Sequence, residues 1–269
     1  MKIFVCIKQV PGISEVKIDP KTNTLIREGI PSITNPMDQN AMQLALSIKE
    51  KRESEVIALS MGPPQAEEVL REALAMGADK AYLLTDRAFA GADTLATSHT
   101  LALAIKKVLE ESGKDEDYLV ICGTQAIDGD TAQVGPELAE ELDIPQITYV
   151  KKFDFIDENT IKVERVFRTE EIVILETKLP ALVSVLKEVN IPQYPTLLGI
   201  VEAYEKNEVT YLDAVALKAD KSFIGLTGSQ TEVWKIFIPE RKGEHKKLSG
   251  TVDEMVRELC QNLKEDKIF

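Results

Sequence analysis

Short apolar runs alternate with amphipathic segments along the first half of the chain. The runs are bounded by polar or turn-forming residues, which is typical of strands buried in a sheet. They cover residues 2–8, 55–60, 80–85, 118–122 and 147–150. The segments between them carry apolar residues at near-helical spacing, over residues 36–51, 63–77, 93–112 and 130–142. Five strands separated by four helices predict an α/β fold, with a mostly parallel, doubly wound, Rossmann-like sheet and helices on both faces.

The pattern changes after residue 150. Residues 151–180 alternate polar and apolar positions, as expected for an antiparallel meander, and residues 181–186 form another apolar strand. Residues 205–248 show no strong periodicity, whereas residues 251–264 have the pattern of an amphipathic helix. The apolar side chains on one face of that helix are Val252, Met255, Val256, Leu259 and Leu263.

These patterns predict two parts. We expect an α/β nucleotide-binding domain over residues 1–205, the meander included, and a C-terminal arm and helix over residues 206–269. A stretch of roughly 40 residues without periodicity is uncommon inside a compact domain. We therefore expect the arm to pack on another chain. The alternative is a loop-rich subdomain that packs on the chain's own core.

Charge and composition narrow the classes of function. The formal net charge is −13, which disfavours nucleic acid as a partner because its phosphates would be repelled. Three widely spaced cysteines and two histidines, His99 and His245, provide neither a disulfide framework nor a metal motif. No apolar run is long enough to span a membrane, and the start of the chain does not resemble a signal peptide, so we expect a cytoplasmic protein.

The most informative stretch is GTQAIDGDTAQVG, residues 123–135, directly after the fourth predicted strand. In such sheets ligands lie beyond the carboxyl ends of the strands. We predict that Asp130 or Thr131 caps a helix whose first N–H groups, up to that of Val134, face a phosphate, while Gly135 allows close approach. The alternative is a capped connection without a ligand. Two aspartates beside a diphosphate are unfavourable, unless they face ribose hydroxyls.

Two more loops are expected at the same edge of the sheet. One follows the first strand and leads to Asn35 and Asp38, which we expect to cap a helix or to contact a ligand. The other is SMGPPQA, residues 60–66. Neither G-x-G-x-x-G nor a P-loop lysine motif is present, and there is no nucleophile elbow. We expect no catalytic side chain and no metal site.

Several segments together resemble the beta subunit of electron-transfer flavoproteins over nearly the whole chain. They are CIKQVPG, NPMDQNA, MGPPQA, LREALAMGADKAYLLTD, QAIDGDTAQVG, VERVFRTEEIVIL and LPALVSVLKEVNIPQYP. The segment TDRAFAGADTLATS and the DGDTAQVG form of the loop are most similar to the electron-bifurcating group of anaerobic bacteria. The fold that the resemblance implies is an adenine-nucleotide-binding α/β domain.

The resemblance implies a heterodimer with an alpha subunit that holds one FAD. This chain would hold a second nucleotide, which is FAD in the bifurcating group and AMP in ordinary members. NAD(H) would be the substrate near the beta flavin. Ferredoxin and a flavin-dependent dehydrogenase, of the acyl-CoA, caffeyl-CoA or lactate type, would exchange the electrons, and the flavin would do the redox chemistry. The nucleotide contacts carried over to this sequence are Cys6, Asn35, Pro36, Met37, Asp38, Met61, Ala126, Ile127, Asp128, Gly129, Asp130, Thr131, Ala132, Gln133, Val134 and Gly135.

Some features depart from the family or leave alternatives open. Gln193 stands where the family often has arginine, and Glu170-Glu171 where it often has glycine. Arg165 matches a family position and is expected to face the flavin domain of the alpha subunit. The small residues of AFAGAD, 88–93, favour FAD over AMP because they leave room for a larger ligand. A nucleotide-binding sensor of the universal-stress type is the alternative from another class.

Ferredoxin raises a question of charge. Ferredoxins are acidic, so an acidic chain attracts one only through a local basic patch, or the partner subunit must do so. The candidate patch is Arg241, Lys242, Lys246 and Lys247. Ferredoxin reduction that keeps its rate and salt dependence after charge reversal of these four residues would dismiss the patch.

Overall fold

The computed structural model describes residues 1–12, 32–113, 117–168, 171–234 and 247–268. The chain divides into two compact units, Met1–Trp234 and Lys235–Phe269. Glu170, His245 and three members of the candidate basic patch (Arg241, Lys242 and Lys246) lie outside the described residues, so the interpretations that rest on them stay untested.

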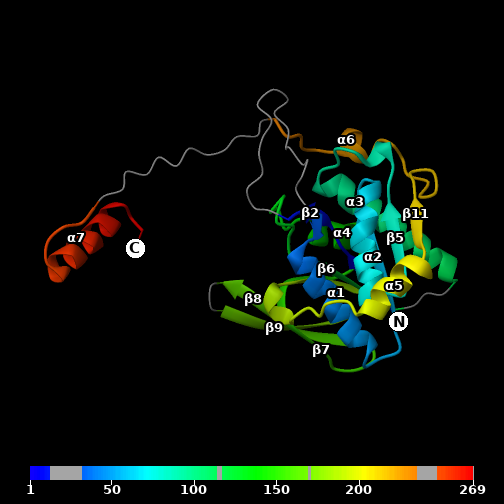
Figure 1. Ribbon diagram of the computed structural model, residues 1–269, viewed down its shortest axis with the longest axis horizontal. Coiled ribbons are helices and arrows are strands. Elements are labelled where there is room, and N and C mark those ends of the chain that lie inside the picture. Colours follow the sequence, from blue (N-terminus) through cyan, green and yellow to red (C-terminus); the bar gives the residue numbers. More distant parts are fainter. Residues whose placement is uncertain (13–31, 114–116, 169–170, 235–246, 269) are drawn as a thin grey trace. The chain divides into compact units, whose positions relative to one another are not determined.

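A nine-stranded sheet forms the centre of the first unit, in the order β11-β5-β4-β1-β6-β10-β7-β8-β9 (Figure 1). Its parallel part runs from β11 to β7, and β8 and β9 continue it antiparallel. The parallel strands are β1 (Lys2–Cys6), β4 (Glu55–Met61), β5 (Lys80–Leu84), β6 (Tyr118–Gly123), β7 (Gln146–Phe155), β10 (Ala181–Val185) and β11 (Val209–Leu212). The predicted α/β fold with a mostly parallel sheet is confirmed.

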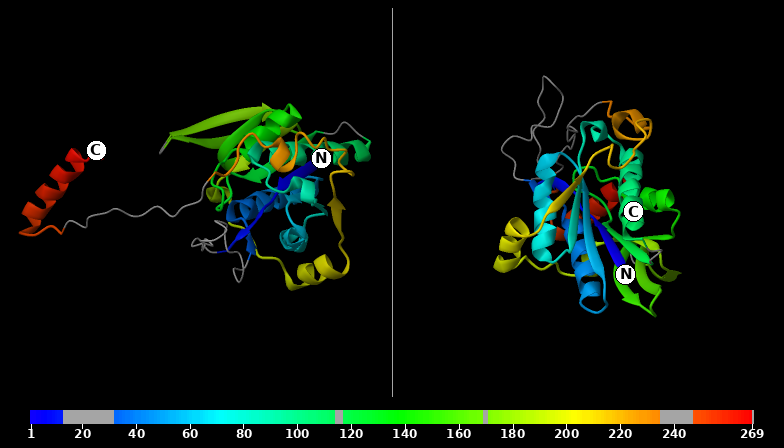
Figure 2. Two further views of the ribbon diagram at one scale, coloured as in Figure 1. Left: turned by 90° about the horizontal axis from the view of Figure 1, so that it is seen from above. Right: turned by 90° about the vertical axis from the view of Figure 1, so that its right-hand side faces the viewer.

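Helices cover both faces of this sheet because its strands are apolar on both sides (Figure 2). One buried cluster contains Ile3 and Leu119 and packs under α1 (Pro36–Lys49) and α2 (Glu67–Met76). A second contains Phe4 and Val120 and packs under α3 (Thr94–Ser112) and α4 (Val134–Leu142). Alternate residues of one strand therefore belong to opposite cores, as the pleat requires.

The antiparallel meander is an extension of the main sheet. Strand β7 pairs with β10 over its first half and with β8 (Thr160–Arg168) over its second half, and β9 (Glu171–Lys178) closes the edge. Tyr149, where β7 changes partner, has a positive φ of 58°, which is rare for an aromatic residue. A separate small sheet pairs β2 (Gln9–Pro11) with β3 (Ser32–Thr34).

The stretch after residue 186 contains elements that the hydrophobic pattern did not predict. Helix α5 (Leu197–Glu205) lies on α2, β11 adds an edge strand next to β5, and α6 (Gly225–Gly228) contacts the loop before α3. Residues 209–212 and 225–228 are thus ordered parts of the first unit, although their sequence shows no periodicity. Short edge elements of this kind are specified by tertiary contacts more than by pattern.

Helix α5 is held against α2 by a close backbone contact and by hydrogen bonds from one arginine. A side chain at Gly199 would collide with the carbonyl of Ala75, so glycine allows the two helices to touch. The Arg71 guanidinium donates to the carbonyl oxygens of Ala203 and Asn207 (2.6 Å to Asn207) and pairs with Glu67 at 2.7 Å. Arg71 therefore satisfies carbonyl groups at the end of α5 that the helix itself leaves free.

The described part of the second unit contains α7, Val252–Glu265. Thr251 and Glu254 form a capping box at its start, which matches the predicted amphipathic helix over 251–264 within one residue. Its apolar side chains Val252, Val256 and Leu259 are all exposed. Among the described residues, the structure contains no helix long and apolar enough to span a membrane.

Truncation of a central side chain tests this core. Leu119→Ala on β6 removes a fully buried side chain, and we expect the free energy of unfolding to fall by about 2–5 kcal/mol. The matched control is Leu198→Ala on α5, an exposed leucine, for which we expect a change within about 0.5 kcal/mol. Denaturant unfolding measures both, and equal losses would contradict the described core.

Candidate functional site

Three loops meet at the carboxyl edge of β4, β1 and β6, which are neighbours in the sheet. After β1 the chain continues to β4 on one side, and after β5 it crosses to β6 on the other side. This reversal places the topological switch point between β1 and β6, where Cys6 pairs with Cys122. The predicted convergence of the loops after the first, second and fourth strands is therefore confirmed.

Asn35 joins the start of α1 to the loop after β6. It is fully buried; its amide Nδ2 donates to the carbonyl of Gln125 at 2.9 Å, and its Oδ1 accepts from the N–H of Ile127 at 3.2 Å. Its own N–H donates to the carbonyl of Lys8 at 2.9 Å. Of the two roles expected for Asn35, the structure contradicts the side-chain cap of α1, because the amide makes no cap bond and holds the loop; contact with a ligand stays a prediction.

Asp38, one turn into α1, holds the ends of two strands. Its Oδ2 accepts from the N–H of Lys8 at 2.8 Å, and its Oδ1 accepts from the N–H of Gly123 at 3.2 Å. A side chain at Gly123 would collide with that carboxylate and with Met37, so the glycine is required for the approach. Burial raises the pKa of Asp38 to about 7, and hydrogen bonds from Asn35, Lys8 and Gly123 oppose the shift.

The two aspartates of the loop, which argued against a phosphate, are both engaged by the protein. The Lys8 ammonium contacts Asp128 at 2.7 Å and 2.9 Å. The amide of Gln125 donates to Asp130. Lys8 therefore balances the charge of Asp128, whereas Asp130 keeps its charge and gains one hydrogen bond from a neutral amide. Lys8 is a site residue that the sequence motif did not reveal, because a single lysine after a strand resembles ordinary surface charge.

The backbone between Asp130 and Gly135 presents a row of free donors. Within the described part of the chain, no hydrogen bond takes up the N–H groups of Thr131, Ala132, Gln133, Val134 and Gly135. Asp130 and Ala132 have positive φ values of 54° and 55°, and Gln133 is in the right-handed helical region. Successive residues of alternating hand make a concave nest of N–H groups that suits an anion.

The expected helix start in this loop is wrong in detail. Helix α4 begins at Val134 rather than at residue 130, and its N-cap is Gln133 without a side-chain cap bond. Asp130 and Thr131 therefore do not cap it. The positive φ of Asp130 and Ala132 breaks the helix there, which leaves four more residues in the loop than the apolar spacing indicated. The N–H groups we singled out remain free all the same.

The other predicted contacts occupy several environments. Cys6 ends β1 in the buried core, where burial raises its pKa to about 12, so it is an inert thiol.

Met61 ends β4 and is half-buried, and Pro36 and Met37 form the partly exposed start of α1. Gly135 is buried and lets α4 approach Cys122 and Leu182. Along the loop, Ala126 is half-buried, and Ile127, Asp128 and Gly129 are exposed.

The segment 88–93 does not keep its small residues free for a ligand. Gly91 faces Leu226, and the N–H of Leu226 donates to the carbonyl of Ala90 at 3.0 Å, so α6 covers the segment. Asp93 caps α3 and also accepts from the N–H groups of Gln230 and Thr231 at 2.8 Å and 2.9 Å. These contacts with later residues account for the small side chains, which removes that argument for FAD.

Polar side chains also line the contact between α3 and α4 beside the nest. Glu137 accepts from Thr94 at 3.1 Å and from Ser98 at 3.4 Å, and burial is the main cause that raises its pKa. His99 contacts Glu141 at 2.9 Å, which makes it a helix-pairing residue. Among the described residues, no group of three or more His, Cys, Asp and Glu side chains is placed to hold a metal ion.

Arg165 lies on β8, opposite Val150 and Val173. Its guanidinium lies 5.8 Å from the centre of the Phe167 ring, and its buried Nε has no acceptor among the described residues. A buried donor without an acceptor is unfavourable by roughly 1–3 kcal/mol. Gln193 donates its N–H to Gln43 of α1 at 2.9 Å, so that position contacts the chain's own core.

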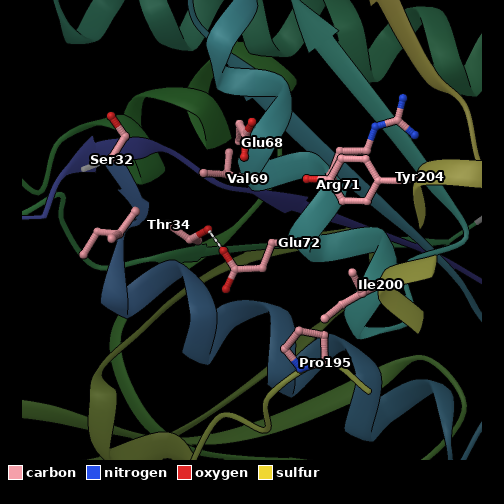
Figure 3. Close-up of a pocket in the computed structure, with 11 residues that line it drawn as sticks. Ser32, Thr34, Glu68, Val69, Arg71, Glu72, Pro195, Ile200 and Tyr204 are labelled. Carbon is pink, nitrogen blue, oxygen red and sulfur yellow. Dashed lines mark hydrogen bonds between the residues drawn. The ribbon is translucent and has the colours of Figure 1, made fainter. Parts of the chain in front are cut away.

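A separate pocket of about 260 Å³ lies between α2, α5 and β3 (Figure 3). Glu72 accepts from Thr34, and also from Gln39 at 3.0 Å, so its carboxylate serves to join β3 and α1 to α2. Arg71 is engaged by α5 and Glu67. Two of the charged side chains that line this pocket, Arg71 and Glu72, therefore already serve to hold neighbouring elements together.

Comparison with known proteins agrees with this architecture. The model of the electron transfer flavoprotein domain matches residues 22–217. The electron transfer flavoprotein subunit beta of Thermoanaerobacterium thermosaccharolyticum is 52% identical over 265 residues, 98% of each chain. That of Clostridium acetobutylicum is 48% identical over 99% of each chain. The caffeyl-CoA reductase-Etf complex subunit CarD of Acetobacterium woodii is 49% identical over 100% of each chain.

Removal of the Asn35 amide tests its hold on the loop. Asn35→Ala leaves the carbonyl of Gln125 and the N–H of Ile127 without their partner, and we expect unfolding free energy to fall by about 1–3 kcal/mol. Asn159→Ala, in the exposed turn between β7 and β8, is the matched control, with a change within about 0.5 kcal/mol. Indistinguishable losses in denaturant unfolding would contradict the role.

The raised pKa of Asp38 has a defined effect on stability. The folded chain binds one more proton than the unfolded chain between pH 3.8, the ordinary pKa of an aspartate, and about pH 7, its pKa in the folded chain. The stabilising contribution of this carboxyl is therefore complete below pH 3.8 and is lost as pH rises through 7. We expect wild type to lose stability relative to Asp38→Asn, by about 1.4 kcal/mol per pH unit in that window.

Denaturant unfolding at pH 4, 5, 6 and 7 measures this difference. Asp157→Asn is the control, because Asp157 is exposed and its hydrogen bonds from Asn159 and Thr160 lower its pKa. Its difference from wild type should stay flat over the same window. A flat difference for Asp38→Asn as well would show that Asp38 titrates normally.

Proposed function

Because the chain belongs to the electron transfer flavoprotein family and is similar to its beta subunits over its whole length, we propose that it binds FAD and, with an alpha subunit, moves electrons by flavin-based bifurcation or confurcation. NAD(H) is the substrate near the flavin of this chain. Ferredoxin and a flavin-dependent dehydrogenase, of the acyl-CoA, caffeyl-CoA or lactate type, are the other redox partners.

The observation that carries the nucleotide site is the row of free N–H groups over residues 131–135. An anion at this nest would satisfy donors that the chain leaves open, at the switch point of a doubly wound sheet. Lys8 balances Asp128 nearby, and the position of Gly129 opens to free space. The residues therefore fit the phosphates of an adenine nucleotide, with loop residues 126–135 as proposed contacts.

Cys6, Asn35 and Asp38 take indirect parts in this proposal. The side chains of Asn35 and Asp38 hold the loop, and Cys6 lies in the core at the end of β1. Pro36, Met37 and Met61 lie at the exposed or half-buried rim of the same edge. The bound flavin would supply the redox chemistry, and the chain's own residues position the nucleotide and neutralise its phosphates. No side chain of the site is assigned a proton transfer.

The choice of FAD over AMP rests on the family resemblance. A relative named as part of a caffeyl-CoA reductase-Etf complex is 49% identical over the entire chain, which favours the bifurcating group. AMP in the same nest, as a passive ligand of a non-bifurcating carrier, is the second candidate. Both share the adenosine phosphate that the nest fits. A universal-stress sensor is set aside, because the family match covers most of the chain.

The alpha subunit is the partner proposed for α7 and for Arg165. The apolar side of α7, in the second unit, would be buried against it. Arg165 on β8 is proposed to face the flavin domain of that subunit.

Cofactor content of the co-expressed alpha–beta complex tests the proposal. After acid release and chromatography, we expect two FAD per heterodimer. One FAD with one AMP would replace bifurcation by the simple carrier. One FAD and no second nucleotide would contradict the nest as a nucleotide site.

Two substitutions at one position assign the second nucleotide to the nest. Ala132→Pro forces φ to about −65° and removes an N–H, so we expect it to abolish the second nucleotide. Ala132→Gly tolerates the positive φ and should retain it. Equal nucleotide content in both variants would place the cofactor elsewhere.

A further inference from the structure

One carboxyl group connects the two strands whose loops form the site. Asp38 accepts from the N–H of Lys8 at the end of β1 and from the N–H of Gly123 at the end of β6. Lys8 in turn reaches Asp128 at the tip of the loop, at 2.7 Å. The base and the tip of the loop are therefore both linked to Asp38, whose side chain is buried.

We propose that Asp38 is a positioning residue that makes nucleotide binding by this chain depend on protonation. The ionised carboxylate holds the loop 124–133 in its binding conformation, and the protonated carboxyl releases it. The inference rests on the proposed nucleotide site and adds what controls that site.

The chemistry of the carboxyl group explains why protonation matters here. An ionised carboxylate only accepts hydrogen bonds, and both of its oxygens face backbone N–H groups. After protonation, one oxygen carries an O–H that points at a donor, so one of the two bonds is lost. The bond to Gly123, at 3.2 Å, is the longer of the two. Loss of that bond frees the residue from which the loop begins.

The groups around Asp38 set the pH at which this happens. Burial raises its pKa to about 7, and the charge of Lys8 opposes the shift. The thiols of Cys6 and Cys122 on β1 and β6 face the carboxylate but stay neutral, since burial raises the pKa of both. Asp128 is paired with Lys8, and Asp130 with Gln125. The transition therefore falls near neutral pH.

The direction follows from weighing two effects. Protonation removes a negative charge, which favours a phosphate nearby, but it also removes a bond that orders the loop. Two backbone N–H donors already compensate part of the carboxylate charge, and the charge of Lys8 acts in the same direction although its ammonium is paired with Asp128. The loss of order should therefore dominate, and affinity should fall as pH falls.

FAD binding to the alpha–beta complex, stripped of its nucleotides, measures the effect. FAD is the suitable probe because its phosphates are diesters and do not titrate near neutrality. If only the ionised form binds, the apparent Kd scales inversely with the ionised fraction. For a pKa of about 7 we expect Kd of the beta site to rise about ten-fold from pH 8 to pH 6. The Ala132→Pro complex provides the contribution of the alpha site, which is subtracted.

Two variants separate this role from a general loss of structure. Asp38→Asn does not titrate and directs an amide N–H₂ at one backbone donor, so its beta site should bind FAD at least ten-fold more weakly than wild type at pH 8, with no dependence on pH. Asp157→Asn, in a distant turn, should keep the wild-type profile. If Asp38→Asn does not fold, protection of the Gly123 amide against exchange in wild type is followed instead, and it should fall from pH 8 to pH 6.

Three results would overturn the inference while leaving the nucleotide site intact. They are a wild-type Kd constant within two-fold over this range, tighter binding at pH 6, and an unchanged profile in Asp38→Asn. Absence of FAD from the beta site at every pH would instead overturn the proposed function, and this inference with it.

Discussion

The structure of the site depends on one constraint: backbone groups in an irregular, partly buried loop need hydrogen-bond partners. Where β1 and β6 end, neither the sheet nor a helix supplies them. Asn35 and Asp38, both at the first turn of α1, supply them instead, by binding Gln125 and Ile127 within the loop and Lys8 and Gly123 at the strand ends. Helix α1 thus acts as a polar support on its N-terminal turn and as a core helix along the rest of its length. With these groups satisfied, residues 131–135 form a continuous row of N–H groups without an acceptor in the described part of the chain.

Much of the fold was predictable from the sequence because each strand is a continuous apolar run and each helix carries an apolar stripe. Strands β1, β4, β5 and β6 and helices α1 and α3 fall within a few residues of their predicted places. The prediction failed where tertiary contacts decide. Strand β11 is specified by its place beside β5, and α5 by the contact of Gly199 with Ala75 and by Arg71. The start of α4 was misplaced because positive φ at Asp130 and Ala132 leaves no mark in hydrophobic spacing.

The candidate site was predictable in position but not in the roles of its residues. The switch-point rule and the glycine-rich stretch located the edge of the sheet, and family resemblance indicated a nucleotide. Neither showed that Asn35 and Asp38 bind backbone groups, nor that Lys8 and Gln125 engage Asp128 and Asp130. Such pairs lie up to 120 positions apart in the chain, and only the fold brings them together. The small residues of 88–93, taken as space for a ligand, proved to be a seat for α6.

The close fit between Asp38 and Gly123 means that these two distant positions cannot change independently in evolution. A side chain at 123 and a carboxylate at 38 compete for one volume, so a change at either position restricts the other. In a lineage that keeps Asp38, the last residue of β6 must stay glycine. A designer who transfers the loop 124–135 to another sheet must carry the first turn of α1 along with it, because the loop does not contain the groups that hold its own backbone.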